Sequence, residues 1–80
     1  MRFFDNGFAE AARFRRIAIG ATQDAVRVIA GAPALALADR GGSTLWVYTY
    51  IDSKSLVSSY DVLFGADGRV RRTSHTRVEF

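Results

Sequence analysis

The sequence predicts an α+β domain in which two N-terminal helices pack on a three-stranded antiparallel β-meander, in the order ααβββ. Two observations support this class. Apolar residues recur at every third or fourth position in the first part of the chain, which is helical spacing, and at every second position from residue 43 onward, which is strand spacing. Turn-forming residues mark each change between segments. No internal repeat or linker divides the 80 residues, so we expect residues 1–80 to form a single domain.

The first helix is predicted over residues 5–18. Phe8, Phe14 and Ile17 are spaced so that they share one face of a helix. An aspartate or an asparagine at its start can cap the free amide groups, and Gly20 is placed to end it.

A second and shorter helix is predicted between two punctuating residues. Thr22 stands at an N-cap position, and Val26 and Ala30 belong to an apolar stripe. Gly31 supplies a left-handed exit, and Pro33 prevents the helix from continuing.

The strongest strand signal lies in residues 43–51, which are rich in aromatic and β-branched side chains. The preceding residues 34–42 alternate alanine and leucine before a turn sequence, so they are predicted to be a short strand or an extended connector. Alternation in the strong strand separates two sets of side chains: Trp46, Tyr48 and Tyr50 on one face, and Leu45, Val47, Thr49 and Ile51 on the other.

Two further strands complete the predicted meander, over residues 56–64 and 69–80. The Asp67-Gly68 pair between them is a strong hairpin signal. One face of the first of these strands carries three large side chains: Tyr60, Val62 and Phe64. Unbroken alternation in the last strand brings three cations to one face: Arg69, Arg71 and Arg77.

The composition argues against several kinds of chemistry. The chain has no cysteine, so it has no disulfide, thiolate metal site or cysteine nucleophile. Its one histidine, His75, offers no familiar zinc spacing, and no pair of carboxylates is placed for acid–base catalysis. We therefore expect no enzymatic activity, no cofactor and no metal ion, and we expect His75 to be a surface residue.

The charge balance favours anionic partners without choosing among them. The formal net charge is +3 and the pI is about 10.0. Such a surface attracts anionic lipid headgroups, nucleic acid or acidic proteins. The N-terminal residues lack the apolar run of a secretory signal, and no cysteine is present for lipidation. The expected location is the cytoplasm for the chain as written, and the periplasm or outer membrane if a leader precedes it.

The aromatic set of the central strand is the first candidate binding surface. If the helices cover the aliphatic set, Trp46, Tyr48 and Tyr50 form an open patch suited to a protein partner. The alternative is that the helices pack on the aromatic rings. We expect partial exposure of the two tyrosines because a phenol hydroxyl needs water or a partner, while both alternatives stay open for Trp46.

The arginines of the last strand are the second candidate. Arg69, Arg71 and Arg77 on one face would bind an anionic headgroup or an acidic partner. The alternative is that these charges protect an edge strand from aggregation. Arginines interleaved with aromatic residues also leave a small nucleic-acid-binding protein as a less favoured alternative, and a homodimer stays open.

Spaced residues along most of the chain resemble the BamE (SmpA/OmlA) family of small outer-membrane lipoproteins. The pattern consists of three parts: Gly20-x-Thr22-xxx-Val26-xxxx-Gly31-x-Pro33, then Trp46-x-Tyr48, then Phe64-xxx-Gly68-x-Val70. The resemblance implies an ααβββ fold and a non-catalytic role in inserting β-barrel proteins into the outer membrane.

The same resemblance implies contacts with other subunits of the insertion machine and with anionic phosphatidylglycerol. By position, the implied contact residues are Pro33 and the connector after it, which includes Leu35, together with Trp46 and Tyr48. The sequence departs from the family in lacking its lipidated cysteine and in a longer segment between Pro33 and Trp46. A stand-alone soluble relative is therefore an alternative.

Overall fold

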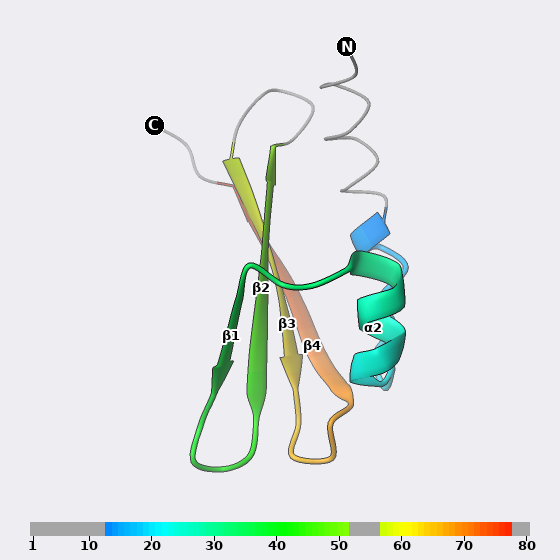
Figure 1. Cartoon of the computed structure of the whole chain (residues 1–80), viewed down its shortest axis with the longest axis vertical. Coiled ribbons are helices and arrows are strands. Elements are labelled where there is room, and N and C mark those ends of the chain that lie inside the picture. The colour runs from blue at the N-terminus through cyan, green and yellow to red at the C-terminus, as the bar shows by residue number, and fades with distance from the viewer. Residues whose placement is uncertain (1–12, 52–56, 78–80) are drawn as a thin grey trace.

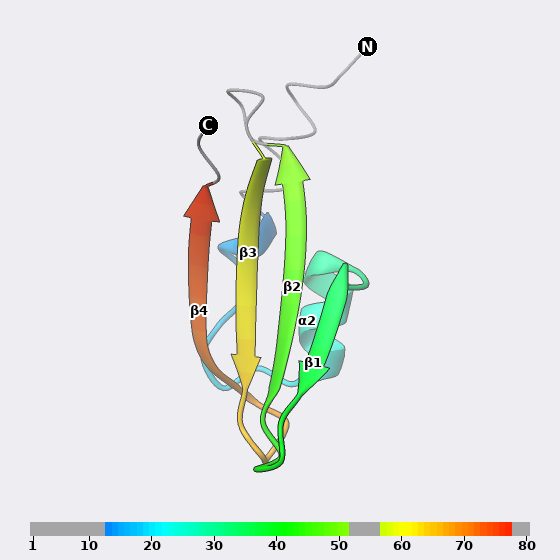
Figure 2. The same cartoon turned by 90° about the vertical axis from the view of Figure 1, so that its left-hand side faces the viewer.

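The computed structural model of the protein describes residues 13–51 and 57–77. Its elements are α2 (Gln23–Ala30), β1 (Leu35–Ala38), β2 (Thr44–Ile51), β3 (Val57–Phe64) and β4 (Val70–Arg77). The strands form one antiparallel sheet in the order β1-β2-β3-β4. Helix α2 lies against one face of this sheet (Figure 1), and Figure 2 looks onto the opposite face.

The α+β class is confirmed, but the predicted count of elements is not matched. Residues 34–42 contain a true strand, β1, which pairs with β2 and extends the sheet to four strands. The first predicted helix falls mainly on residues 5–12, outside the described residues. Within the described part, Arg13 and Phe14 are helical, and the chain then turns as the Ile17 amide donates to the Phe14 carbonyl at 3.1 Å.

Helix α2 begins and ends at the residues that the sequence indicates. The Thr22 hydroxyl accepts a hydrogen bond from the Ala25 amide at 3.2 Å, which satisfies one of the free amides of the first turn. Gly31 ends the helix with φ of 79°, a conformation that glycine adopts without strain. Val26 and Ala30 are buried against the sheet.

The helix-side face of the sheet and the helical segments form the core. Its buried members are Phe14, Ile17, Val26, Ala30, Trp46, Tyr48, Tyr50, Val62, Phe64 and Val70. Of the two alternatives for the aromatic face, packing of the helical layer on the rings is the one observed, and the expected partial exposure of the two tyrosines is wrong: Trp46 and Tyr48 are each 4% exposed and Tyr50 is 8% exposed. The rings of β2 carry the largest apolar area, and the register sets them beside Val62 and Phe64, so covering this face removes more apolar surface from water.

A β-bulge changes the predicted alternation of β4. Val70 pairs with Phe64, whereas Arg72 pairs with Leu63, so Arg71 is an additional residue on β4. Side chains beyond the bulge are shifted by one position relative to an unbroken strand. The prediction that three arginines share one face of this strand is wrong for this reason.

Residues 20–22 tie the helical segment to the start of β4. The Gly20 amide donates to the Val70 carbonyl at 2.8 Å, and the Val70 amide donates to the Ala21 carbonyl at 2.9 Å. The Arg69 guanidinium donates to the Gly20 carbonyl at 3.0 Å. This attachment holds the beginning of α2 in place over the sheet.

Candidate functional site

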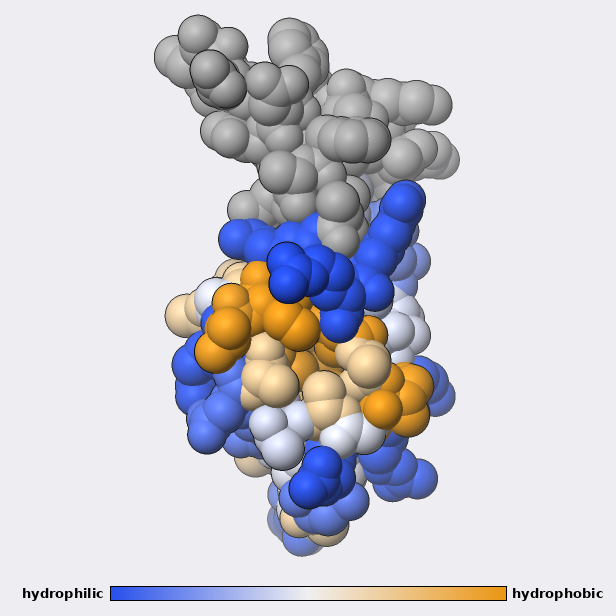
Figure 3. All heavy atoms as spheres, turned by 90° about the vertical axis from the view of Figure 1, so that its right-hand side faces the viewer, coloured by the Kyte–Doolittle hydropathy of each residue, from blue (hydrophilic) through white to orange (hydrophobic). Residues whose placement is uncertain are grey.

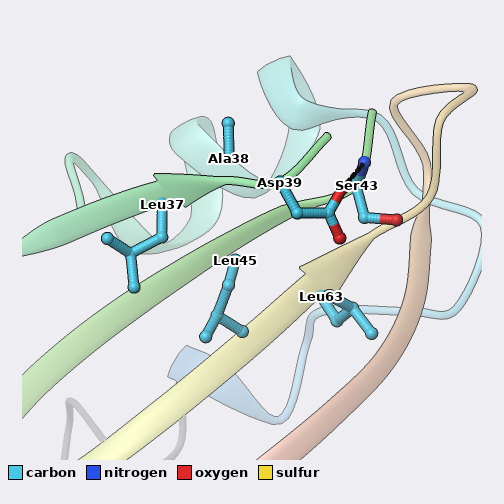
Figure 4. A pocket seen from close by; sticks show the side chains of 6 residues that line it. All are labelled: Leu37, Ala38, Asp39, Ser43, Leu45 and Leu63. Carbon is cyan, nitrogen blue, oxygen red and sulfur yellow. Dashed lines mark hydrogen bonds between the residues drawn. The ribbon is translucent and has the colours of Figure 1, made fainter. Parts of the chain in front are cut away.

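Three leucines form a row across the face of the sheet opposite α2. Leu37 of β1 pairs with Leu45 of β2, which pairs with Leu63 of β3. Figure 4 shows these side chains leaving the sheet on one side while Ala38 points to the other. We call these three residues the leucine row. They line an open recess of about 120 Å³ together with Ala38, Asp39 and Ser43.

The turn beside the leucine row is held by its own aspartate. One Asp39 carboxylate oxygen, Oδ1, accepts hydrogen bonds from the Gly41 amide at 2.8 Å and from the Ser43 amide at 3.0 Å. This is the Asx-type turn chemistry that aspartate favours. The role of this carboxylate is therefore to shape the end of the recess.

Further aliphatic side chains are exposed at both ends of this sheet face. Leu35 and Leu37 are each 50% exposed, while Ile51 is 51% and Val57 is 40% exposed. Polar residues lie between these ends, and the Ser59 hydroxyl donates to Asp61 Oδ1 at 2.8 Å among them. The face is thus apolar at the β1 edge and polar across its middle. We call it the open face.

The predicted partner-binding residues divide into two groups. Leu35 is exposed on the open face and lies opposite Val47, next to the leucine row. Pro33 is partly buried in the connector between α2 and β1. The three aromatic residues of β2 belong to the core and do not form an exposed patch for a protein partner: Trp46, Tyr48 and Tyr50.

The predicted anion-binding arginines are not brought together. Arg69 is engaged with the Gly20 carbonyl, before the start of β4. Arg71 sits at the bulge with its side chain against Gly65, where a Cβ would stand 2.7 Å from the Arg71 Cδ. Arg77 pairs with Ser58 at the far end of β4, and its side chain lies outside the described part of the chain. The structure therefore gives no shared arginine face.

A second apolar surface lies on the helix side of the molecule. Figure 3 shows apolar residues gathered over the middle of this side, with hydrophilic residues above and below. Val28 on α2 is 86% exposed, and Ile19 is 66% exposed. Arg27 of the same helix instead lies over the Trp46 ring, with its guanidinium carbon 4.8 Å from the ring centroid.

Tyr48 connects the sheet to the end of α2. Its hydroxyl donates to the Gly31 carbonyl at 2.9 Å, which supplies a partner for this buried phenol. Burial raises the pKa of Tyr48 above its ordinary value, and the positive charges of Arg27 and Arg13 oppose that rise. The neutral phenol is therefore the form that the folded state favours.

We expect Tyr48→Phe to reduce the dependence of stability on pH above neutrality. A raised folded-state pKa gives stability that is fully present below the unfolded value of about 10 and is lost as pH rises through the folded value. Urea unfolding at pH 8 and pH 11 would measure this loss in both proteins. The variant should be about 1 kcal/mol less stable at pH 8, from the missing hydrogen bond, and should lose less than the native chain on going to pH 11. Equal losses in the two proteins would contradict the assignment.

Neither the leucine row nor the contact of His75 with Tyr50 was predicted from the sequence. The Tyr50 hydroxyl lies 2.6 Å from His75 Nε2, and these residues belong to strands that are not adjacent in the sheet. The signal for the leucine row was present in the alternation of residues 34–38. No local pattern pointed to the contact of His75, because it depends on the register of β2, β3 and β4 and on the bulge.

No metal or membrane-spanning element is indicated in the described ranges. Within residues 13–51 and 57–77, no group of three or more metal-ligating side chains could hold an ion. The same part of the chain contains no helix whose length and apolar character would let it cross a membrane.

The fold and the site define an α+β module in which a helical layer covers one sheet face and no described residue outside the sheet covers the other. This arrangement is similar to a crystal structure described as a candidate osmotically inducible lipoprotein, OsmE, with a TM-score of 0.71. The two share 17% sequence identity, and the match covers 94% of this chain and 82% of the other. No protein-family model and no curated protein matches this chain. At this identity the likeness shows the fold alone. It therefore supports the fold implied by the BamE resemblance.

Proposed function

We propose that this protein is a non-catalytic, BamE-like interaction module that binds a partner protein through the open face of its sheet. The observation that carries the proposal is the row Leu37, Leu45 and Leu63, continued by the exposed Leu35 at the β1 edge. Leu35 and Leu37 are half-exposed and Leu45 and Leu63 are partly exposed, so together they form a contiguous apolar patch of the kind that marks interaction sites. The proposed contact surface replaces the aromatic patch that the sequence suggested.

The chemistry around the leucine row favours a protein over other ligands. Asp61 and Ser74 lie two pairing steps along the sheet from the row, on the same face, and Arg72 stands opposite Leu63. An apolar centre with a polar rim of both charge signs is typical of protein–protein interfaces. Binding of anionic phospholipid rests on the family resemblance, since Arg69 is engaged with the Gly20 carbonyl and Arg71 lies at the bulge.

The nucleic-acid alternative required exposed rings on which bases could stack. Because Trp46, Tyr48 and Tyr50 are buried, their rings are not exposed for bases to stack on. The open face offers aliphatic side chains in its place, which favour a protein partner.

Site-specific photo-cross-linking tests the proposal directly. A photoreactive residue at Leu37 should give a discrete adduct with another protein in cells that produce this chain. Val28 is the matched control because it is also apolar and exposed but lies on α2. An adduct at Val28 and none at Leu37 would contradict the proposal, as would an adduct of twice the mass of the chain, which would assign the open face to a second copy.

A further inference from the structure

A separate recess lies on the helix side of the sheet, away from the open face. It has a volume of about 200 Å³ and is lined by Arg15, Tyr50, Tyr60 and His75. Tyr60 pairs directly with His75 across β3 and β4, while Tyr50 comes from β2 and Arg15 from the turn after Phe14. Three strands and one turn thus contribute to a single cavity.

The walls of this recess are held by contacts among its own residues. The Tyr50 hydroxyl and His75 Nε2 are 2.6 Å apart, and their rings stack with centroids 5.9 Å apart. On the other side, Tyr60 stacks on the buried Phe14 ring at 4.9 Å with an interplanar angle of 11°. A wall that is already ordered lowers the cost of binding a ligand.

The polar groups of the recess favour an anion. Arg15 is exposed and contributes a permanently charged guanidinium, and no acidic side chain among the described residues lines the cavity. When Tyr50 donates to Nε2, the imidazole proton resides on Nδ1, which leaves His75 with a donor of its own. The recess therefore combines a cation with aromatic side chains.

We propose that this recess binds a small aromatic carboxylate. A planar guanidinium matches the two oxygens of a carboxylate, and the aromatic walls would accept a flat ring. The size is suitable, since a cavity of about 150 Å³ can hold a benzene molecule. This site is independent of the proposed protein-binding function because it lies on the other face of the sheet.

The test is a titration of the full chain with benzoate. NMR signals of the His75 imidazole and the tyrosine rings are monitored during the titration. Benzamide, which is neutral, and acetate, which lacks the ring, are the matched ligands. Benzoate should shift the His75 signals and bind at least about tenfold more tightly than either control ligand. No shift at His75, or equal binding of benzamide, would overturn the proposal.

Two arginine variants distinguish benzoate binding in the recess from nonspecific attraction to positive charge. Arg15→Gln should weaken benzoate binding about tenfold, whereas Arg16→Gln, which removes the same charge at a neighbouring exposed position, should change it less than about twofold. Equal weakening of benzoate binding in both variants would overturn the proposal. Unchanged Trp46 fluorescence confirms that both variants remain folded.

Discussion

Phe14→Ala should lower the free energy of unfolding by about 4 kcal/mol, the middle of the range for core phenylalanines. Phe14 is 1% exposed, and its ring lies 5.3 Å from Tyr48, 5.2 Å from Tyr50 and 4.9 Å from Tyr60, measured between centroids. Truncation would leave a cavity beneath all three rings. A domain of this size has a total stability of about 4–12 kcal/mol, so the variant is expected to be largely unfolded or close to it.

Urea denaturation followed by Trp46 fluorescence measures this effect. Phe14→Leu is the control, because it keeps an apolar side chain of similar length and should cost about 1.5 kcal/mol. A cost below 1 kcal/mol for the alanine variant would mean that the segment before Ile17 does not belong to the core. The experiment thus tests how the helical layer before α2 joins the sheet.

The boundaries of α2 could be predicted from the sequence because they depend on local chemistry. A threonine cap needs only an amide three residues later. A glycine adopts a positive φ without strain because it has no Cβ. The turn before β4 was also predictable, since the Asp67 side chain accepts from the Arg69 amide at 3.0 Å within the turn itself. Each of these features is decided within a few residues.

The choice of covered sheet face could not be made from β2 alone. Alternation separates Trp46, Tyr48 and Tyr50 from the aliphatic set correctly, but it does not say which set meets the helices. The register with β3 decides the question, because Ser59 and Asp61 share the face of Thr49 and Val47. A face that contains a carboxylate and several hydroxyls costs more to bury than one that holds mostly rings.

The predicted placement of three arginines on one face of the last strand differs from the structure for another physical reason. Periodicity assumes one residue per pairing step, and Arg71 breaks that assumption at the bulge opposite Leu63 and Phe64. The same shift places His75 opposite Tyr60 and within reach of Tyr50. One additional residue therefore separates the arginines that regular alternation would place on one face. It also brings His75 to the side of the sheet where it lines the recess.

Adjacent substitutions on β3 should have opposite consequences and test the assignment of the two faces. Val62 is 0% exposed on the helix side, so Val62→Asp would place an unpaired carboxylate in the core. The penalty for burying such a charge is at least several kcal/mol, comparable with the whole stability of the domain, and the variant should be unfolded at room temperature. Circular dichroism and the Trp46 emission maximum measure this outcome.

Leu63→Asp changes the next residue and should leave the protein folded. Leu63 lies on the open face opposite Arg72, where a carboxylate remains hydrated and gains a cross-strand partner of opposite charge. We expect a loss of about 1 kcal/mol or less in the free energy of unfolding, together with loss of the protein adduct formed from a photoreactive residue at Leu37. A folded Val62→Asp variant would show that the faces are assigned wrongly. A folded Leu63→Asp variant that keeps the adduct would instead remove the leucine row from the binding surface, so the two substitutions separate an error in the fold from an error in the function.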